Sequence, residues 1–254
     1  MRLHIAVKAT AMAILLSAVT AIELAQPAAA IPTEGTLIAK ARRRLNFRVG
    51  ARPSRYRVGG FSRSGAGCSK DQQPAALVPP ASQEGTDKSK AAVAVDKTAV
   101  ERPTFFVYMP AIAAKSAQFT LQDESGKQQL HSVEFQLTGK AGIVGITLPP
   151  SAPSLQVGQK YFWQVAVACD PDEPSDVTVV SSWVERVQVA TAASGDRLTV
   201  LAEQGVWQDV LTQLALQRYQ APADQAIAED WSSLMEDAGL TQYKQAQVIQ
   251  IVKN

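Results

Sequence analysis

The stretch KYFWQVAVAC at residues 160–169 alternates between large apolar side chains and smaller or polar ones. One face of an extended chain over this stretch carries Tyr161, Trp163, Val165, Val167 and Cys169. Because side chains alternate across a strand, this face is predicted to be buried. A large inward tryptophan is what a small sandwich needs between its two sheets. A core is therefore the favoured interpretation of this aromatic stripe, and a sugar-stacking platform is the alternative.

Similar short apolar runs, separated by turns, surround this stretch. They occupy residues 104–109, 118–122, 129–137, 142–148 and 177–189. No helical pattern interrupts them, and strands at this spacing favour antiparallel pairing. We therefore expect an immunoglobulin-like antiparallel β-sandwich over residues 103–192.

The periodicity changes after Gly195 from two residues to about 3.6, as in amphipathic helices. One helix is predicted to end near Tyr219, and a second to begin at Pro222 and end at Gly239. Residues 193–254 thus form a helical hairpin and a tail, so the chain is mainly β with a C-terminal α part. We interpret the hairpin as a cap on the sandwich, with one unit of a protein-binding helical repeat as the alternative. The tail from Thr241 fits either a short helix or an added strand.

The first thirty residues have the features of a secretory signal peptide. Arg2 and Lys8 precede an apolar run over residues 9–22, and Ala28-Ala29-Ala30 provides a small-residue cleavage site. The run is shorter than the ~20 apolar residues of a membrane-spanning helix. We expect cleavage near Ala30 and a periplasmic or secreted chain that does not span a membrane.

Charge is distributed unevenly along the 254 residues. Residues 40–70 hold ten basic residues and no acidic one, whereas residues 71–254 have a net charge of −8. We expect a basic Arg/Gly-rich arm over residues 31–70, followed by a flexible Pro/Ala/Ser-rich linker over residues 71–102.

The arginines Arg42, Arg43 and Arg44 are candidate contacts of the arm with a partner. Export argues against nucleic acid, so an anionic lipid surface or cell-wall polymer is the functional interpretation. The favoured interpretation of the arm is a solvated tail that lies partly on the acidic body of the chain.

Cys68 and Cys169 are the two cysteines of the chain. In an oxidising compartment we expect them to form a disulfide, and two thiols are the alternative. A bridge closing a loop of this length contributes ~4–5 kcal/mol in the chain-entropy treatment.

Few residues are suited to catalysis or metal binding. His131 is the one histidine beyond the leader, which excludes a multi-histidine metal site and most forms of a catalytic triad. The acidic loop at residues 170–176 matches no calcium-binding pattern and is interpreted as solvated. We predict no catalytic residue, metal or cofactor. An enzyme would have to use carboxylates such as Glu185 or Asp209.

Several motifs in order resemble the cyanobacterial family called domain of unknown function 928 (DUF928). They are RVGGFSR at 57–63, Cys68, ALVP at 76–79, RPTFFVYMP at 102–110, GIVGITLP at 142–149, YFW at 161–163, CD at 169–170, WVER at 183–186 and GVWQDV at 205–210. The resemblance implies an exported protein, and its matching cysteine positions support the disulfide. It supplies no activity, ligand or catalytic residue, and the arm here is richer in arginine than the family pattern.

We therefore expect an exported, non-catalytic protein-interaction module of the cell envelope, whose partner is another envelope protein. The first alternative is binding to an anionic envelope surface or a glycan, through the basic arm and the aromatic residues Phe106 and Tyr108. A carboxylate-based enzyme is the second alternative.

Overall fold

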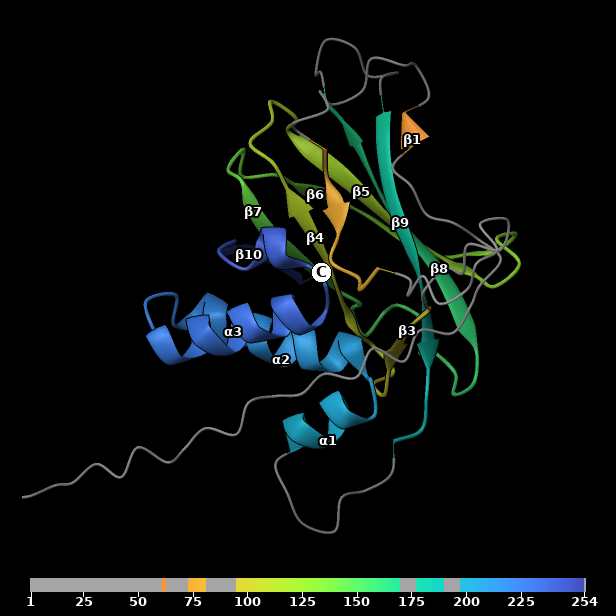
Figure 1. The fold of residues 1–254 in the computed structure, drawn as a ribbon. Coiled ribbons are helices and arrows are strands. Elements are labelled where there is room, and N and C mark those ends of the chain that lie inside the picture. Colours follow the sequence, from red (N-terminus) through yellow and green to blue (C-terminus); the bar gives the residue numbers. More distant parts are fainter. Residues whose placement is uncertain (1–60, 63–72, 81–94, 170–176, 190–196, 254) are drawn as a thin grey trace, which may run out of the picture. The chain divides into compact units, whose positions relative to one another are not determined.

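The computed structural model describes residues 61–62, 73–80, 95–169, 177–189 and 197–253 (Figure 1). All of them belong to one compact unit formed by residues 43–254. The described chain is mainly β, with its helices near the C-terminal end, as the sequence predicts. The predicted leader, the arginines at 42–44 and the acidic loop at 170–176 lie outside the described residues.

The larger sheet has the strand order β1-β9-β8-β5-β6, and β3 also pairs with β9. Its strands are β1 (Phe61–Ser62), β3 (Val95–Thr98), β5 (Ser116–Asp123), β6 (Gln129–Gln136), β8 (Lys160–Ala168) and β9 (Val177–Arg186). The smaller sheet has the order β10-β7-β4-β2. Its strands are β2 (Ala75–Ala76), β4 (Thr104–Met109), β7 (Gly142–Thr147) and β10 (Val248–Lys253).

Two of the strand pairs are parallel, which corrects the expectation of a wholly antiparallel arrangement. β3 runs parallel to β9, and β10 runs parallel to β7. Both parallel strands come from outside the predicted sandwich at residues 103–192. Parallel strands need long connections, and β10 reaches β7 only after the helices have intervened.

The two sheets share one hydrophobic core. Trp163 of β8 is 1% exposed, and its ring centroid lies 5.2 Å from that of Phe105 on β4 and 6.4 Å from that of Phe119 on β5. Val180 of β9 and Val252 of β10 belong to the same cluster. The prediction that the face containing Trp163 is buried is therefore confirmed.

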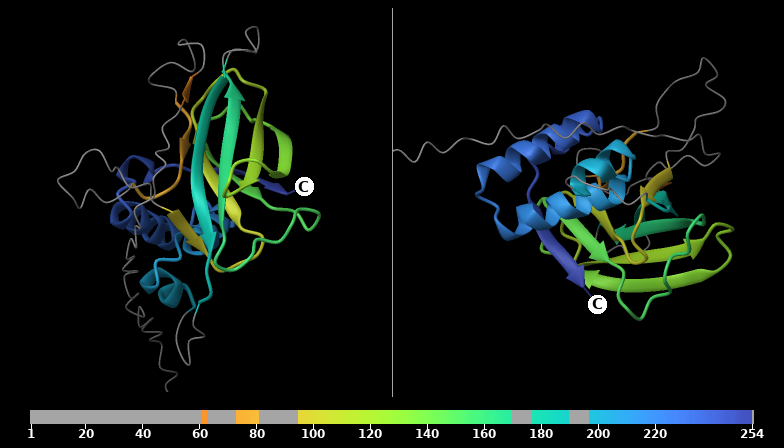
Figure 2. Two further views of the ribbon diagram at one scale, coloured as in Figure 1. Left: turned by 90° about the vertical axis from the view of Figure 1, so that its right-hand side faces the viewer. Right: turned by 90° about the horizontal axis from the view of Figure 1, so that it is seen from below.

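Three helices pack against the other face of the smaller sheet (Figures 1 and 2). They are α1 (Arg197–Glu203), α2 (Trp207–Gln220) and α3 (Gln225–Asp237), and a short 3-10 turn follows at Thr241–Tyr243. Gly205, with φ +66°, separates α1 from α2, so the first predicted helix is two helices. Gly239, with φ +71°, ends α3, where the N–H of Leu240 bonds to the carbonyl of Met235.

The tail ends in the strand β10, which can lie close to β7 because two residues of β7 are glycines. A Cβ on Gly142 would lie 2.5 Å from Cγ2 of Ile249, and a Cβ on Gly145 would lie 2.7 Å from Cδ1 of Ile251. Glycine at both positions lets β10 approach β7 closely. Arg218 of α2 fixes the chain just before β10 by donating from Nε to the carbonyl of Ala246.

Residues 71–102, predicted to be a flexible linker, contain structured parts. Ala75 and Ala76 pair with β4, Leu77 is fully buried, and residues 95–98 pair with β9. Leu77 fills a site against the helices, which local composition does not reveal. Residues 71–72 and 81–94 of the predicted linker lie outside the described residues.

Candidate functional site

The two aromatic residues proposed to stack on a ligand, Phe106 and Tyr108, pack against other residues of the chain. Phe106 is 1% exposed and belongs to the core between the smaller sheet and the helices, so its ring is not available to a ligand. This corrects the prediction for Phe106, and the reason is that both faces of β4 are covered. Tyr108 is partly buried, with its ring centroid 5.0 Å from that of Tyr243.

The structure describes one of the two cysteines that are predicted to form a disulfide. Cys169 lies just after β8 and is not a free thiol. Cys68 lies outside the described residues, so its pairing with Cys169 stays a prediction.

The N-terminal turn of α2 holds three buried side chains that bind three different segments. Nε1 of Trp207 donates to the carbonyl of Leu77 at 2.9 Å. Nε2 of Gln208 donates to the carbonyl of Thr104. Trp207 and Gln208 thus join the helix to the chain after β2 and to the start of β4.

Asp209, the third of these residues, accepts two hydrogen bonds from the end of β3. Thr98 donates its hydroxyl to Oδ1 at 2.6 Å, and Ala99 donates its N–H to Oδ2 at 3.0 Å. Burial raises the pKa of Asp209, and these two bonds and the charge of Arg197 oppose that shift. With both oxygens engaged, Asp209 is placed to hold β3 against α2.

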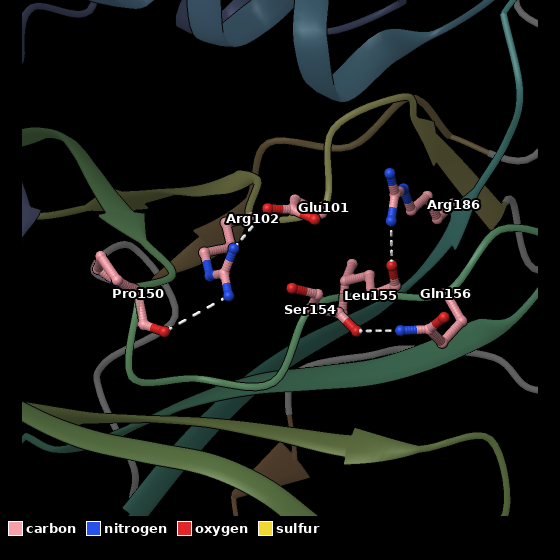
Figure 3. Close-up of polar contacts among 7 residues, drawn as sticks. All are labelled: Glu101, Arg102, Pro150, Ser154, Leu155, Gln156 and Arg186. Atoms are coloured by element: carbon pink, nitrogen blue, oxygen red, sulfur yellow. Dashed lines mark hydrogen bonds and ion pairs between the residues drawn. The ribbon is translucent and has the colours of Figure 1, made fainter.

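Two arginines bind the loop between β7 and β8 (Figure 3). Arg186 donates from Nη1 to the carbonyl of Leu155, and Arg102 donates from Nη2 to the carbonyl of Pro150 at 3.4 Å. Arg102 also forms an ion pair with Glu101. These contacts use the two guanidinium groups to fasten a loop at one end of the sheets.

His131 lies on β6 opposite Leu121, on the side of the sheet that faces the core. Burial lowers its pKa, and its Nε2 has no hydrogen-bond partner among the described residues. The predicted position at the edge of the core is confirmed, although no described polar group holds the ring at Nε2.

The strand β6 itself has one free side. It pairs with β5 and lies at the end of the larger sheet. Since Leu137 donates its N–H to the carbonyl of Lys115, the odd-numbered residues before it direct their backbone groups toward β5. The N–H and C=O of Ser132 and Glu134 therefore point away from the sheet. No described residue bonds to these groups.

The edge of β6 lies beside β10. Nε2 of Gln250 donates to the outward carbonyl of Gln136 at 2.9 Å, which shows that this edge accepts a donor. A shallow hollow opens next to this contact, and its lining includes Met109 at the end of β4, Pro110, residues 137–140 after β6, and Ile249 of β10. Its space is about 200 Å³ with the open mouth included. We call β6, Ile249 and this hollow the β6 edge site.

The sequence predicts β6 as a strand but not its place at the end of a sheet. Five of its eight residues are polar or charged (Gln129, His131, Ser132, Glu134 and Gln136), but the same is true of β5, which lies inside the sheet. Polar composition alone therefore does not identify β6 as an edge strand.

Among the described residues, no group of three or more His, Cys, Asp or Glu side chains is placed to hold a metal ion. Within the same part of the chain, no helix has the length and hydropathy to cross a bilayer.

The profile of one protein family, the Domain of Unknown Function (DUF928), matches residues 58–248. The chain belongs to the DUF928 family. The match extends from just before β1 to the first residue of β10, so this DUF928 region includes the β6 strand and the helices. No curated protein sequence matches the chain.

Three solved structures similar to parts of this DUF928 chain have low sequence identity to it. CopC from Methylosinus trichosporium OB3b is 15% identical, with 39% of this chain and 88% of that chain covered and a TM-score of 0.29. The AA10 lytic polysaccharide monooxygenase from Streptomyces lividans is 9% identical, with 39% and 63% covered and a TM-score of 0.28. The C-terminal domain of wzt is 9% identical, with 59% and 93% covered and a TM-score of 0.28. At these scores the likeness supports no conclusion about function.

Proposed function

We propose that this DUF928 chain is an exported, non-catalytic interaction module of the cell envelope that binds an extended segment of another envelope protein at β6. The observation that carries the proposal is the free edge of β6, where the backbone groups of Ser132 and Glu134 point outward. An extended partner segment can add to such an edge as a further strand, with main-chain hydrogen bonds providing affinity.

The composition of β6 supports this use of its edge. Proteins commonly protect long edge strands with proline, lysine or covering segments, since a free edge recruits other chains. The strand spans the eight residues Gln129–Gln136 and contains neither proline nor lysine. An eight-residue edge without these residues is suited to pairing with a partner.

The internal contacts of the motif residues support a non-catalytic role. Asp209, one of the two carboxylates suited to an enzyme, uses both oxygens to hold β3. Trp207, Gln208 and Arg186 bind backbone carbonyls of the same chain. These polar groups stabilise the fold, whereas the outward backbone groups of Ser132 and Glu134 have no partner among the described residues.

Export and the finer architecture belong to the same proposal. The predicted leader at residues 1–30 supports export to the periplasm or beyond, where the Cys68–Cys169 disulfide would form. The core shared by the two sheets supports an immunoglobulin-like sandwich.

The test compares the full chain with Glu134→Pro and Glu134→Ala. Proline at residue 134 removes an outward N–H and leaves the bonds to β5 intact, whereas alanine keeps the N–H. Each protein is incubated with envelope extract at low and high salt, and captured proteins are identified by mass spectrometry. Purified candidates are then tested for direct binding and for protection of the Ser132 and Glu134 amides from hydrogen exchange.

The proposal predicts one defined protein that binds the wild type and Glu134→Ala at high salt, loses binding to Glu134→Pro, and protects both amides. Binding that disappears with salt would favour the electrostatic surface or polymer alternative through the basic arm. Equal binding by Glu134→Pro would overturn the proposed use of β6.

A further inference from the structure

We propose that the segment bound at β6 runs antiparallel to it, has apolar residues at alternate positions, and places a basic residue opposite Glu134. This inference rests on the proposed function and specifies the chemistry of the partner. The alternation and the charge of the segment follow from which backbone and side-chain groups β6 directs to each side, and N-methylated peptides test its antiparallel direction below.

The backbone of β6 determines which residues of the added strand form hydrogen bonds. Ser132 and Glu134 direct both N–H and C=O outward, so they form the hydrogen-bonded pairs of an antiparallel addition. Partner residues opposite them direct their own backbone groups inward and their side chains to the solvent face of the larger sheet. Partner residues opposite Val133 and Phe135 direct their side chains to the other face.

That other face is apolar where the two sheets meet. Phe135 is buried in the shared core, and Val133, Leu137 and Ile249 pack against that core while partly exposed. Side chains opposite Val133 and Phe135 would cover these partly exposed groups. Alternate positions of the segment are therefore apolar.

The hollow lies directly beyond β6, between Leu137 and Ile249 of β10. Its enclosed part has about the size of one water molecule, so it does not take up a whole side chain. A residue of the segment opposite Leu137 would instead cover the mouth of the hollow.

The solvent face supplies the charge. Glu134 is exposed, and its Oε1 accepts a hydrogen bond from Ser116 at 2.6 Å. No described lysine or arginine forms an ion pair with Glu134. A basic side chain directly opposite it gives the cross-strand charge pair that stabilises antiparallel strands.

The probe is a short synthetic peptide in which valine or leucine alternates with threonine and one central arginine, mixed with the ¹⁵N-labelled full chain. We expect protection of the Ser132 and Glu134 amides by about ten-fold or more, since each N–H gains an acceptor. A peptide of the same composition with its apolar residues clustered is the control. N-methylation of the polar positions should weaken binding about ten-fold, and N-methylation of the apolar positions should leave it within about two-fold.

Swapping the charges of Glu134 and of the peptide's arginine tests the proposed ion pair. Glu134→Lys should weaken binding of the arginine peptide a few-fold and restore it when the arginine is replaced by glutamate. Equal sensitivity to N-methylation at both sets of positions, or preference for the clustered peptide, would overturn the inference. If an envelope protein still depends on the Glu134 N–H while the alternating peptide fails, the inference fails and the proposed function stands. If Glu134→Pro changes neither the binding of the envelope protein nor the binding of the peptide, the inference and the proposed function both fail.

Discussion

Gly145 lies on β7 where both β10 and β4 approach it. A Cβ at this position would lie 2.7 Å from Cδ1 of Ile251 and 2.8 Å from Cε1 of Phe106. Both neighbours belong to or pack against the core under the helices. At the residue scale, the absence of a side chain at Gly145 lets β4 and β10, which are distant in sequence, both pair closely with β7.

Gly145→Ala is expected to lower the free energy of unfolding by about 1–3 kcal/mol, because the added methyl overpacks this contact. Denaturant unfolding measures the change. Ile251→Val removes Cδ1, so the double variant should recover part of the loss, with Phe106 limiting the recovery. Equal stability of Gly145→Ala and wild type would show that β10 has room to move.

Asp96 is a buried acid on β3 with 4% exposure, and its Oδ2 has no hydrogen-bond partner among the described residues. Burial raises its pKa well above the ordinary 3.8. The folded chain therefore keeps the proton at pH values where the unfolded chain releases it. Stability then falls as the pH rises above about 4 and continues to fall up to the folded-state pKa.

Asp96→Asn should remove this part of the pH dependence and stabilise the chain at pH 8 relative to wild type. The measurement is the free energy of unfolding at pH 5 and pH 8 for both proteins. The wild type should lose more stability over this interval than the variant. Identical losses would mean that Asp96 ionises freely in the folded chain.

At the scale of elements, the first turn of α2 is fixed by hydrogen bonds between its own side chains and other segments and not by a side-chain cap. No side chain caps its first turn, while Trp207, Gln208 and Asp209 bind three other segments. Motif residues at 205–210 thus assemble β2, β3 and β4 around one helix end. The Trp, Gln and Asp of this motif therefore have a structural role in the fold.

Asp209→Ala is expected to lower the free energy of unfolding by about 2–3 kcal/mol, because two donors on Thr98 and Ala99 lose their acceptor. The Ala99 amide should also exchange faster with solvent. Glu203→Ala, at an exposed position on α1, is the control and should change little. Unchanged exchange at Ala99 would contradict the proposed attachment of β3.

At the scale of the whole molecule, the C-terminal strand joins layers that the predicted domain boundaries separate. Val252 belongs to the core between the sheets, and Val248 belongs to the core under the helices. The helices and the sheets are therefore expected to unfold together.

A chain ending at Gln247 lacks β10 and should lose cooperative unfolding, because it removes strand pairing and apolar contacts from both cores. Circular dichroism during thermal unfolding tests this, with removal of Asn254 alone as the control. A truncated chain with a sharp, wild-type transition would show that the tail is dispensable for folding.

The predicted Cys68–Cys169 bridge also acts on the whole chain. Alkylation of the unfolded, unreduced protein should label neither cysteine, and reduction should lower the free energy of unfolding by up to ~4–5 kcal/mol. Mass spectrometry and denaturant unfolding check both outcomes. Two labelled cysteines without reductant would reject the bridge.

The sequence by itself determined the local elements. Alternation over residues 160–169 and its neighbours predicted six of the ten described strands, because each side chain's face follows from its own element. The 3.6-residue stripes predicted two helices where the described chain has α1, α2 and α3. The polar composition of residues 129–136 was visible too, but not which side of that strand would remain free.

The tertiary structure alone decided strand order and partners. The short strands at 61–62, 75–76 and 95–98, and the choice of a strand for residues 248–253, depend on neighbours far along the chain. Phe106 has the same composition signal as an exposed aromatic and became core because the helices cover β4. The free edge of β6 likewise follows from which strands did not pair with it, and hydrogen bonding between distant segments is not encoded in any local pattern.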